Sequence, residues 1–194
     1  DNGAIVLTAS QPFTSALVMS NPDMFRYEWI WEKQKGSNYA NANKMPMKVH
    51  ENILVFYNLL PKYNPQKTDL NNSYYRKGGI RKSPTKVMGE KSPAGNYLTD
   101  GIRVGRFPRS IQKFSSEGMN KKNFHPTQKP VALFEYLIKT YTNERDLVLD
   151  NCAGSGTTGV AARNLKRNFI LIEKEREYYD IITKRLAEMP KPLF

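Results

Sequence analysis

The sequence predicts an α/β domain that contains a parallel βαβ unit, and two observations lead to that prediction. From residue 130 onward, amphipathic segments and short apolar runs alternate as helix–strand–helix–strand–helix, the order of a parallel βαβ unit. The first 58 residues hold further short apolar runs of the kind that form strands. With 194 residues, of which 39% are apolar, the chain is long enough to bury one core.

The first half of the domain is predicted to hold three strands and one helix. Apolar runs and apolar–polar alternation predict strands at residues 3–9, 26–34 and 51–58. Between the first two strands, Phe13, Leu17 and Val18 follow at helical spacing and predict a short helix. Residues 35–50 are polar, rich in asparagine and too long for a tight turn. Loops of that length tend to be functional or mobile.

The second half is predicted to hold the βαβ unit. Pro130 fits the first turn of a helix, where its missing N–H costs nothing. The apolar stripe of that helix consists of Val131, Phe134, Leu137, Ile138 and Tyr141. The expected strands are residues 146–150 and 168–173, and the expected helices after them are residues 156–167 and 177–189.

The positive charge of the chain is concentrated in its central third. Residues 59–122 hold fourteen basic and four acidic side chains, so they carry +10 of the net +12. The same segment holds seven glycines and five prolines and shows no long amphipathic period, which predicts a loop-rich insert. Aromatic residues lie among the charges, as suits a polyanion with stackable bases.

Two interpretations of this basic segment remain open. Composition favours nucleic-acid binding, but charge runs are often only solvated surface. The basic residues that we expect to contact double-stranded DNA are Arg76, Lys77, Arg81, Lys82, Arg103, Arg106 and Arg109.

Composition excludes several classes of protein. A single cysteine, Cys152, allows no intramolecular disulfide and fits a reducing compartment. Two histidines and one cysteine are too few for a typical structural zinc site, so no metal is expected. No apolar run reaches the roughly 18 residues of a membrane span, and the first residues do not read as a signal peptide. These features predict a soluble, cytoplasmic protein and leave a homodimer open.

The stretch LDNCAGSGTTG, residues 149–159, predicts a ligand site at the end of a strand. Gly154 and Gly156 allow the backbone to approach a ligand closely, and the helix that follows offers free N–H groups. Glu173 ends the next strand, the position from which a carboxylate accepts hydrogen bonds from a ribose. Acids and hydroxyls around the turn favour S-adenosylmethionine over a nicotinamide dinucleotide. The alternative is a turn that is only structural.

Three stretches carry a resemblance to a known family: FHPTQKPVALFEYLI, DLVLDNCAGSGTTGVAA and FILIEKEREYY. Together they resemble the DNA amino-methyltransferases, in the permuted group whose catalytic motif precedes the cofactor motif, common in phages and restriction–modification systems. The resemblance covers residues 3–58 and 123–186. It implies a Rossmann-like S-adenosylmethionine-dependent methyltransferase sheet with an inserted target-recognition region. The expected parts are residues 1–58 as the catalytic half, 59–122 as the insert and 123–194 as the cofactor half.

The resemblance also implies roles for individual residues. The cofactor would be held by His125, Thr127, Gln128, Lys129, Asp150, Gly154, Ser155, Gly156, Thr157, Thr158 and Glu173. Trp31, Lys33 and His50 would lie near a target base rotated out of the duplex, although for Trp31 core or strand-pair packing is the favoured alternative. The chain departs from the family at Asn151 and Cys152, where Pro-Phe is common. We expect Cys152 to be a small buried side chain there.

One family motif is absent. The family orients the target amine with Asp, Asn or Ser followed by Pro-Pro and an aromatic residue, and this chain contains no Pro-Pro pair. We therefore expect an incomplete enzyme whose central strand and catalytic residues lie upstream. The predicted reaction is methyl transfer to adenine N6 or cytosine N4 of DNA. The alternatives are a nucleic-acid-binding module that keeps the fold without turnover, and an RNA methyltransferase.

Overall fold

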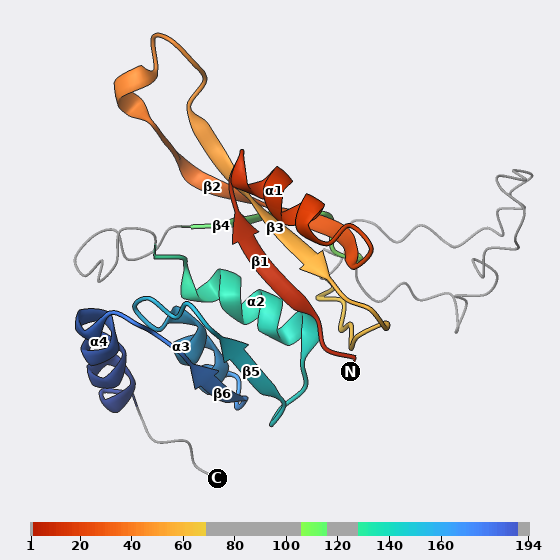
Figure 1. The fold of residues 1–194 in the computed structure, drawn as a ribbon, viewed down its shortest axis with the longest axis vertical. Coiled ribbons are helices and arrows are strands. Elements are labelled where there is room, and N and C mark those ends of the chain that lie inside the picture. The colour runs from red at the N-terminus through yellow and green to blue at the C-terminus, as the bar shows by residue number, and fades with distance from the viewer. Residues whose placement is uncertain (1, 69–105, 116–127, 190–194) are drawn as a thin grey trace, which may run out of the picture. The chain divides into compact units, whose positions relative to one another are not determined.

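The computed structural model describes residues 2–68, 106–115 and 128–189 (Figure 1). The chain divides into two compact units, residues 65–108 and the remainder. In the smaller unit, Thr68 and Arg106 form an isolated antiparallel bridge. There the ammonium of Lys67 also lies 4.6 Å from the centroid of the Phe107 ring. All elements named below belong to the larger unit.

The N-terminal part of the larger unit is a four-stranded mixed sheet with the order β1-β3-β2-β4. Its elements are β1 (Ile5–Ala9), α1 (Phe13–Ser20), β2 (Phe25–Ser37), the short 3₁₀ helix η1 (Tyr39–Asn41), β3 (Lys48–Phe56) and β4 (Ile111–Phe114). β3 pairs antiparallel with both β1 and β2, and β4 pairs parallel with β2. The three strands and the helix predicted for residues 1–58 are confirmed.

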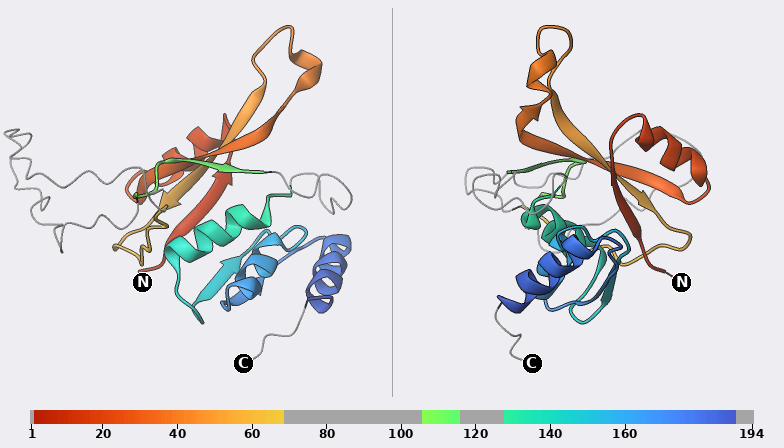
Figure 2. Two further views of the ribbon diagram at one scale, coloured as in Figure 1. Left: turned by 180° about the vertical axis from the view of Figure 1, so that it is seen from behind. Right: turned by 60° about the vertical axis from the view of Figure 1, so that its left-hand side comes forward.

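Two features of this sheet differ from the prediction. β4 lies inside residues 59–122, where composition predicted a loop-rich insert without core elements. Its four residues are too few to show a period, so sequence alone could not separate them from the surrounding loops. In addition, β2 extends to Ser37 and β3 begins at Lys48, so the expected loop of residues 35–50 is strand at both ends and its irregular part is residues 38–47, which include η1 (Figure 2).

The C-terminal part contains the predicted βαβ unit. Its elements are α2 (Val131–Tyr141), β5 (Leu147–Asp150), α3 (Thr157–Asn164), β6 (Asn168–Leu171) and α4 (Arg176–Ala187). β5 and β6 are parallel, with Leu149 opposite Ile170. These elements lie within a few residues of the predicted bounds, and the α/β prediction is confirmed. In the described residues, no strand joins this two-stranded sheet to the four-stranded one.

Helix α2 is buried on two sides. One side packs against the four-stranded sheet, and the other packs against α3 and the two-stranded sheet. Leu133, Leu137 and Tyr141 join the core formed by Trp29, Trp31, Ile53 and Val55 of the four-stranded sheet. Ile138 packs with Ala161 and Ala162 of α3. The predicted stripe is therefore too narrow: Leu133 is fully buried although it lies outside the predicted set, and Val131 and Phe134 are only half-buried.

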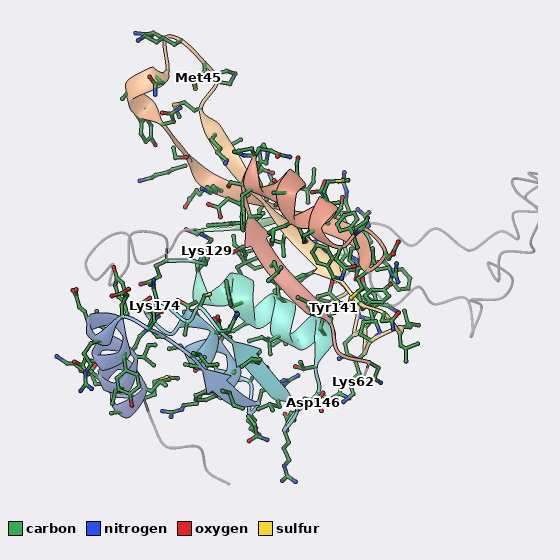
Figure 3. The ribbon with its side chains drawn as sticks, in the orientation of Figure 1. Met45, Lys62, Lys129, Tyr141, Asp146 and Lys174 are labelled. Atoms are coloured by element: carbon green, nitrogen blue, oxygen red, sulfur yellow. The ribbon has the colours of Figure 1, made fainter. Side chains whose placement is uncertain are left out.

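A hydrogen-bonded aromatic group fixes the C-terminal end of α2 on the sheet. The Tyr141 hydroxyl accepts a hydrogen bond from the Trp29 indole N–H at 2.7 Å and lies 2.9 Å from the Tyr27 hydroxyl. Burial raises the pKa of Tyr141 far above its ordinary value, so the hydroxyl stays neutral and available as both donor and acceptor. Figure 3 shows Tyr141 at the end of the helix facing the strands.

We predict that Tyr141→Phe lowers the free energy of unfolding by about 1–3 kcal/mol. The substitution keeps the ring but leaves the buried Trp29 N–H without its acceptor, and an unsatisfied buried donor costs that much. Urea unfolding followed by tryptophan fluorescence measures the change. Tyr179→Phe is the matched control, because Tyr179 is half-exposed on α4 and loses only a solvated hydroxyl. Equal effects of the two substitutions would contradict the assignment.

Candidate cofactor and target-base site

The glycine turn joins the end of β5 to the start of α3. Alternation places Asp150 on the helix-facing side of β5. Its carboxylate accepts hydrogen bonds from the backbone N–H of Cys152, at 3.0 Å, and from the hydroxyl of Thr158. Thr158 and its neighbour Thr157 are both buried. Thr158 therefore fixes the orientation of Asp150 in this structure.

Glu173 closes the turn from the neighbouring strand. One carboxylate oxygen accepts a hydrogen bond from the Gly154 N–H at 2.7 Å, and the other accepts one from the Glu175 N–H at 3.0 Å. The acid predicted from its place after β6 is thus beside the glycine turn. Both carboxylate oxygens of Glu173 therefore act as acceptors at the glycine turn.

The two glycines of the turn adopt backbone conformations that other residues rarely take. Gly154 has φ of 53° and Gly156 has φ of 78°. At Gly156 the space is also limited, because an added Cβ would lie 3.0 Å from the Cγ1 of Ile182 on α4. Glycine is thus required here by both conformation and packing.

Ser155, between the two glycines, is held from two directions. Its hydroxyl donates to the Gln128 side-chain oxygen at 3.0 Å, and its carbonyl accepts from the Arg185 guanidinium at 3.0 Å. Partial burial lowers the pKa of Arg185, whose side chain is half-buried beside the turn. Arg185 was not among the predicted site residues. The only feature of the sequence that indicates it is that it follows the buried Ile182 by three residues, on the inward side of α4.

The residues predicted near the target base fall into two groups. Trp31 is buried, 3% exposed, and its indole N–H donates to the Phe114 carbonyl at 3.0 Å. Trp31 therefore packs in the core, as the alternative prediction for this residue had it. Lys33 instead binds the Glu51 carboxylate at 2.6 Å, and its ammonium lies 5.4 Å from the Trp31 ring centroid. His50 is exposed on β3 opposite Glu32.

Several predicted residues lie outside the part of the chain that the structure describes. These are His125 and Thr127 of the cofactor set, and Arg76, Lys77, Arg81, Lys82 and Arg103 of the DNA set. Arg106 is described within the smaller unit, and the Arg109 carbonyl accepts a hydrogen bond from the Gln112 side chain in the larger one. Cys152 is exposed rather than buried, so the expectation for it was wrong.

Comparison with known proteins identifies the family. The family model described as DNA methylase matches residues 1–184. The chain belongs to this family. The resemblance to the DNA amino-methyltransferases seen in the sequence is thereby confirmed.

Two relatives illustrate the similarity. The Type II methyltransferase M2.DpnII of Streptococcus pneumoniae is 44% identical over 92 residues, which are 47% of this chain and 31% of that protein. The Type II methyltransferase M2.LlaDCHI of Lactococcus lactis subsp. cremoris is 53% identical over 77 residues, 40% of this chain and 28% of that protein. The matched part spans about a third of the length of these relatives.

Solved structures share the fold. The M1.HpyAVI–SAM complex is similar with a TM-score of 0.61 and 30% identity, covering 95% of this chain and 74% of that one. The cytosine-N4-specific PvuII DNA methyltransferase has a TM-score of 0.64 at 19% identity, with 95% and 64% covered. The prediction of an S-adenosylmethionine-dependent methyltransferase fold is confirmed.

The residues around the glycine turn fit a nucleoside cofactor with hydroxyls and an amine. Asp150 is the last residue of β5 and Glu173 follows β6, so both lie at the carboxyl edge of two adjacent parallel strands, the edge where α/β sheets bind ligands. Both side chains supply hydrogen-bond acceptors. The positive-φ glycines between them bring backbone atoms close to the same edge of the sheet. A hollow of about 310 Å³ elsewhere, lined by residues of α1 and β2, contains none of these residues.

Two classes of feature are absent from the described residues. No group of three histidine, cysteine, aspartate or glutamate side chains there is arranged to hold a metal ion. No helix among them has the length and apolar character needed to cross a membrane.

We predict that Gly156→Ala destabilises the protein by about 1–2 kcal/mol or more, the cost of a left-handed conformation for a residue with a Cβ. Crowding against Ile182 adds to this cost. Thermal and urea unfolding measure it. Gly3→Ala is the control, since nothing lies within 4 Å of its added Cβ. A Gly156→Ala protein as stable as Gly3→Ala would show that the turn adopts another conformation.

Proposed function

We propose that the protein transfers a methyl group from S-adenosylmethionine to an exocyclic amine of duplex DNA, adenine N6 or cytosine N4. The observation that carries this proposal is the turn itself. Asp150 and Glu173 flank two positive-φ glycines at one edge of a parallel sheet, and Gln128 of the HPTQKP stretch binds the serine between them. The family and the complex of a relative with SAM support the same cofactor.

Within this proposal each residue has a binding role. Glu173 accepts hydrogen bonds from the ribose hydroxyls, and Asp150 with the glycines holds the methionine part. Gln128, with His125, Thr127 and Lys129 of the same stretch, covers the other side. S-adenosylmethionine supplies an electrophilic methyl group. The amine nitrogen forms a bond to that carbon as the carbon–sulfur bond breaks, and the nitrogen then loses a proton. The protein contributes by positioning the two reactants.

The partner in this proposal is double-stranded DNA with the target base rotated out of the helix. The support is the +10 charge of residues 59–122 and the names of relatives, which are Type II methyltransferases. Lys33 and His50 are the residues proposed to lie towards the target base. Transfer of tritiated methyl groups to duplex DNA by the full-length protein tests the proposal, with adenine-only and cytosine-only substrates separating N6 from N4.

A second candidate is a nucleic-acid-binding module that keeps the methyltransferase fold. The observation in its favour is that residues 1–194 contain no Pro-Pro pair, so they lack the motif that orients the amine. Retained binding of both S-adenosylmethionine and DNA without methyl transfer would favour this candidate. Transfer to RNA but not to duplex DNA would favour the RNA methyltransferase.

We predict that Glu173→Ala weakens binding of S-adenosylmethionine by about 1–3 kcal/mol, the scale of lost charge-assisted hydrogen bonds. Isothermal titration calorimetry measures the affinity, and circular dichroism confirms that the variant is folded. Glu175→Ala is the control, because its side chain is exposed and pairs only with Lys174 in the contacts described. Unchanged affinity in a folded Glu173→Ala protein would remove Glu173 from the site.

We predict that replacing Arg76, Lys77, Arg81 and Lys82 by alanine lowers DNA affinity and reduces the salt slope. Each lost phosphate contact changes the slope of log K against log salt by about 0.9. Fluorescence anisotropy over a salt series measures both quantities. The matched control replaces Lys166, Lys174, Arg176 and Lys184, four basic residues of the cofactor half. If both sets change the slope equally, residues 59–122 are only a solvated basic surface.

A further inference from the structure

The carboxylate of Glu51 lies between two lysines that come from distant parts of the chain. Its Oε1 is 2.6 Å from the Lys33 Nζ on the neighbouring strand β2. Its Oε2 is 3.1 Å from the Nζ of Lys129, which precedes α2. All three side chains are largely sheltered, with exposed fractions of 15% for Lys33, 14% for Glu51 and 18% for Lys129.

The sheltered position distinguishes this cluster from an ordinary surface ion pair. Burial alone opposes the charge of Glu51, but the hydrogen bond from Lys33 and the charge of Lys129 outweigh it, so the pKa of Glu51 is lowered. The carboxylate is therefore ionised at neutral pH. Removing its charge would leave two cations close together in a half-buried place, which is costly. The Glu32–Lys113 pair on the same sheet is of similar length, 2.9 Å, but exposed.

Lys129 connects this cluster to the glycine turn. It directly follows Gln128, whose side-chain oxygen accepts the hydrogen bond from the Ser155 hydroxyl. The two neighbouring residues thus make contacts in different directions, Lys129 with β3 and Gln128 with the turn. Figure 3 shows Lys129 at the start of α2, between the four-stranded sheet and the βαβ unit. Fixing Lys129 on Glu51 restricts where Gln128 can place its amide.

We propose that Glu51 is a positioning residue for the cofactor site: through Lys129 it holds Gln128 against Ser155, and through Lys33 it links that site to the strand that carries the proposed target-base residues. The inferred effect on the cofactor rests on the proposed function, whereas the contacts of Glu51 with Lys33 and Lys129 do not depend on it. The alternative is an ion cluster that only adds stability to the sheet. The two differ in whether the effect of Glu51 on the cofactor passes through Gln128.

The first test measures S-adenosylmethionine affinity by calorimetry in the full-length protein. Glu51→Gln keeps the shape of the side chain and removes its charge, and we expect about tenfold weaker binding, a coupling of the size found for networked residues. Lys129→Gln should give a similar loss and serves as the second variant if Glu51→Gln does not fold. Glu32→Gln is the matched control and should bind as the wild type does.

A double-mutant cycle with Gln128→Ala separates positioning from stability. If Glu51 acts through Gln128, then adding Glu51→Gln to Gln128→Ala weakens binding less than about twofold further, because the contact it positions is already gone. A full, additive loss in that background would overturn the inference. So would unchanged affinity of the single Glu51→Gln variant.

Hydrogen exchange tests the same link without any cofactor. Glu51→Gln should increase deuterium uptake in peptides that contain Gln128 and Ser155, whereas Glu32→Gln should not. This measurement distinguishes the two proposals. A wild-type protein that binds no S-adenosylmethionine but shows the exchange response contradicts the proposed function and keeps the link. A protein that binds the cofactor, with exchange unchanged by Glu51→Gln, keeps the function and overturns the link.

Discussion

The burial of α2 on two sides is the constraint on which the rest of the larger unit depends. No strand of the described residues joins the two sheets, so the helix between them must hold them together. Leu133 and Leu137 pack against the four-stranded sheet, and Ile138 packs against α3. Polar contacts at its C-terminal end add to this. Asn64, which lies after β3 in the chain, donates to the carbonyls of Lys139 and Thr142 and anchors the end of the helix.

The position of the same helix determines the geometry of the site. The residues just before α2 are the ones that contact both the glycine turn and β3, so the position of the helix sets where Gln128 and Lys129 can reach. On the opposite side, α4 supports the turn with Arg185. A turn held from its flanks by two helices and closed by Glu173 presents acceptors whose orientation is fixed before any ligand arrives. Such preorganisation reduces the ordering that binding requires.

The sequence predicted the elements with strong local signals and missed those with weak ones. The glycine turn and Glu173 were predictable because strand ends, small residues and an acid at a set spacing all agree. β4 was not, because four residues between glycines and prolines carry no period. Trp31 was ambiguous, since an aromatic residue on a strand suits either core packing or a base, and its burial shows the first. Ion pairs such as Glu51 with Lys129 join residues 78 positions apart, and no local pattern encodes them.

The two-stranded sheet shows how far the fold of the cofactor half depends on its helices. Val148 and Phe169 face α3, whereas Leu147, Leu149 and Ile170 on the other face are about half exposed or more. A pair of four-residue strands is marginal by itself, so its stability comes from the helical side. Asp150 ends the first of these strands on that same covered side, where the Thr158 hydroxyl binds it. The polar groups of the glycine turn are thus built on the half of the sheet that is packed, and the open apolar face bears none of them.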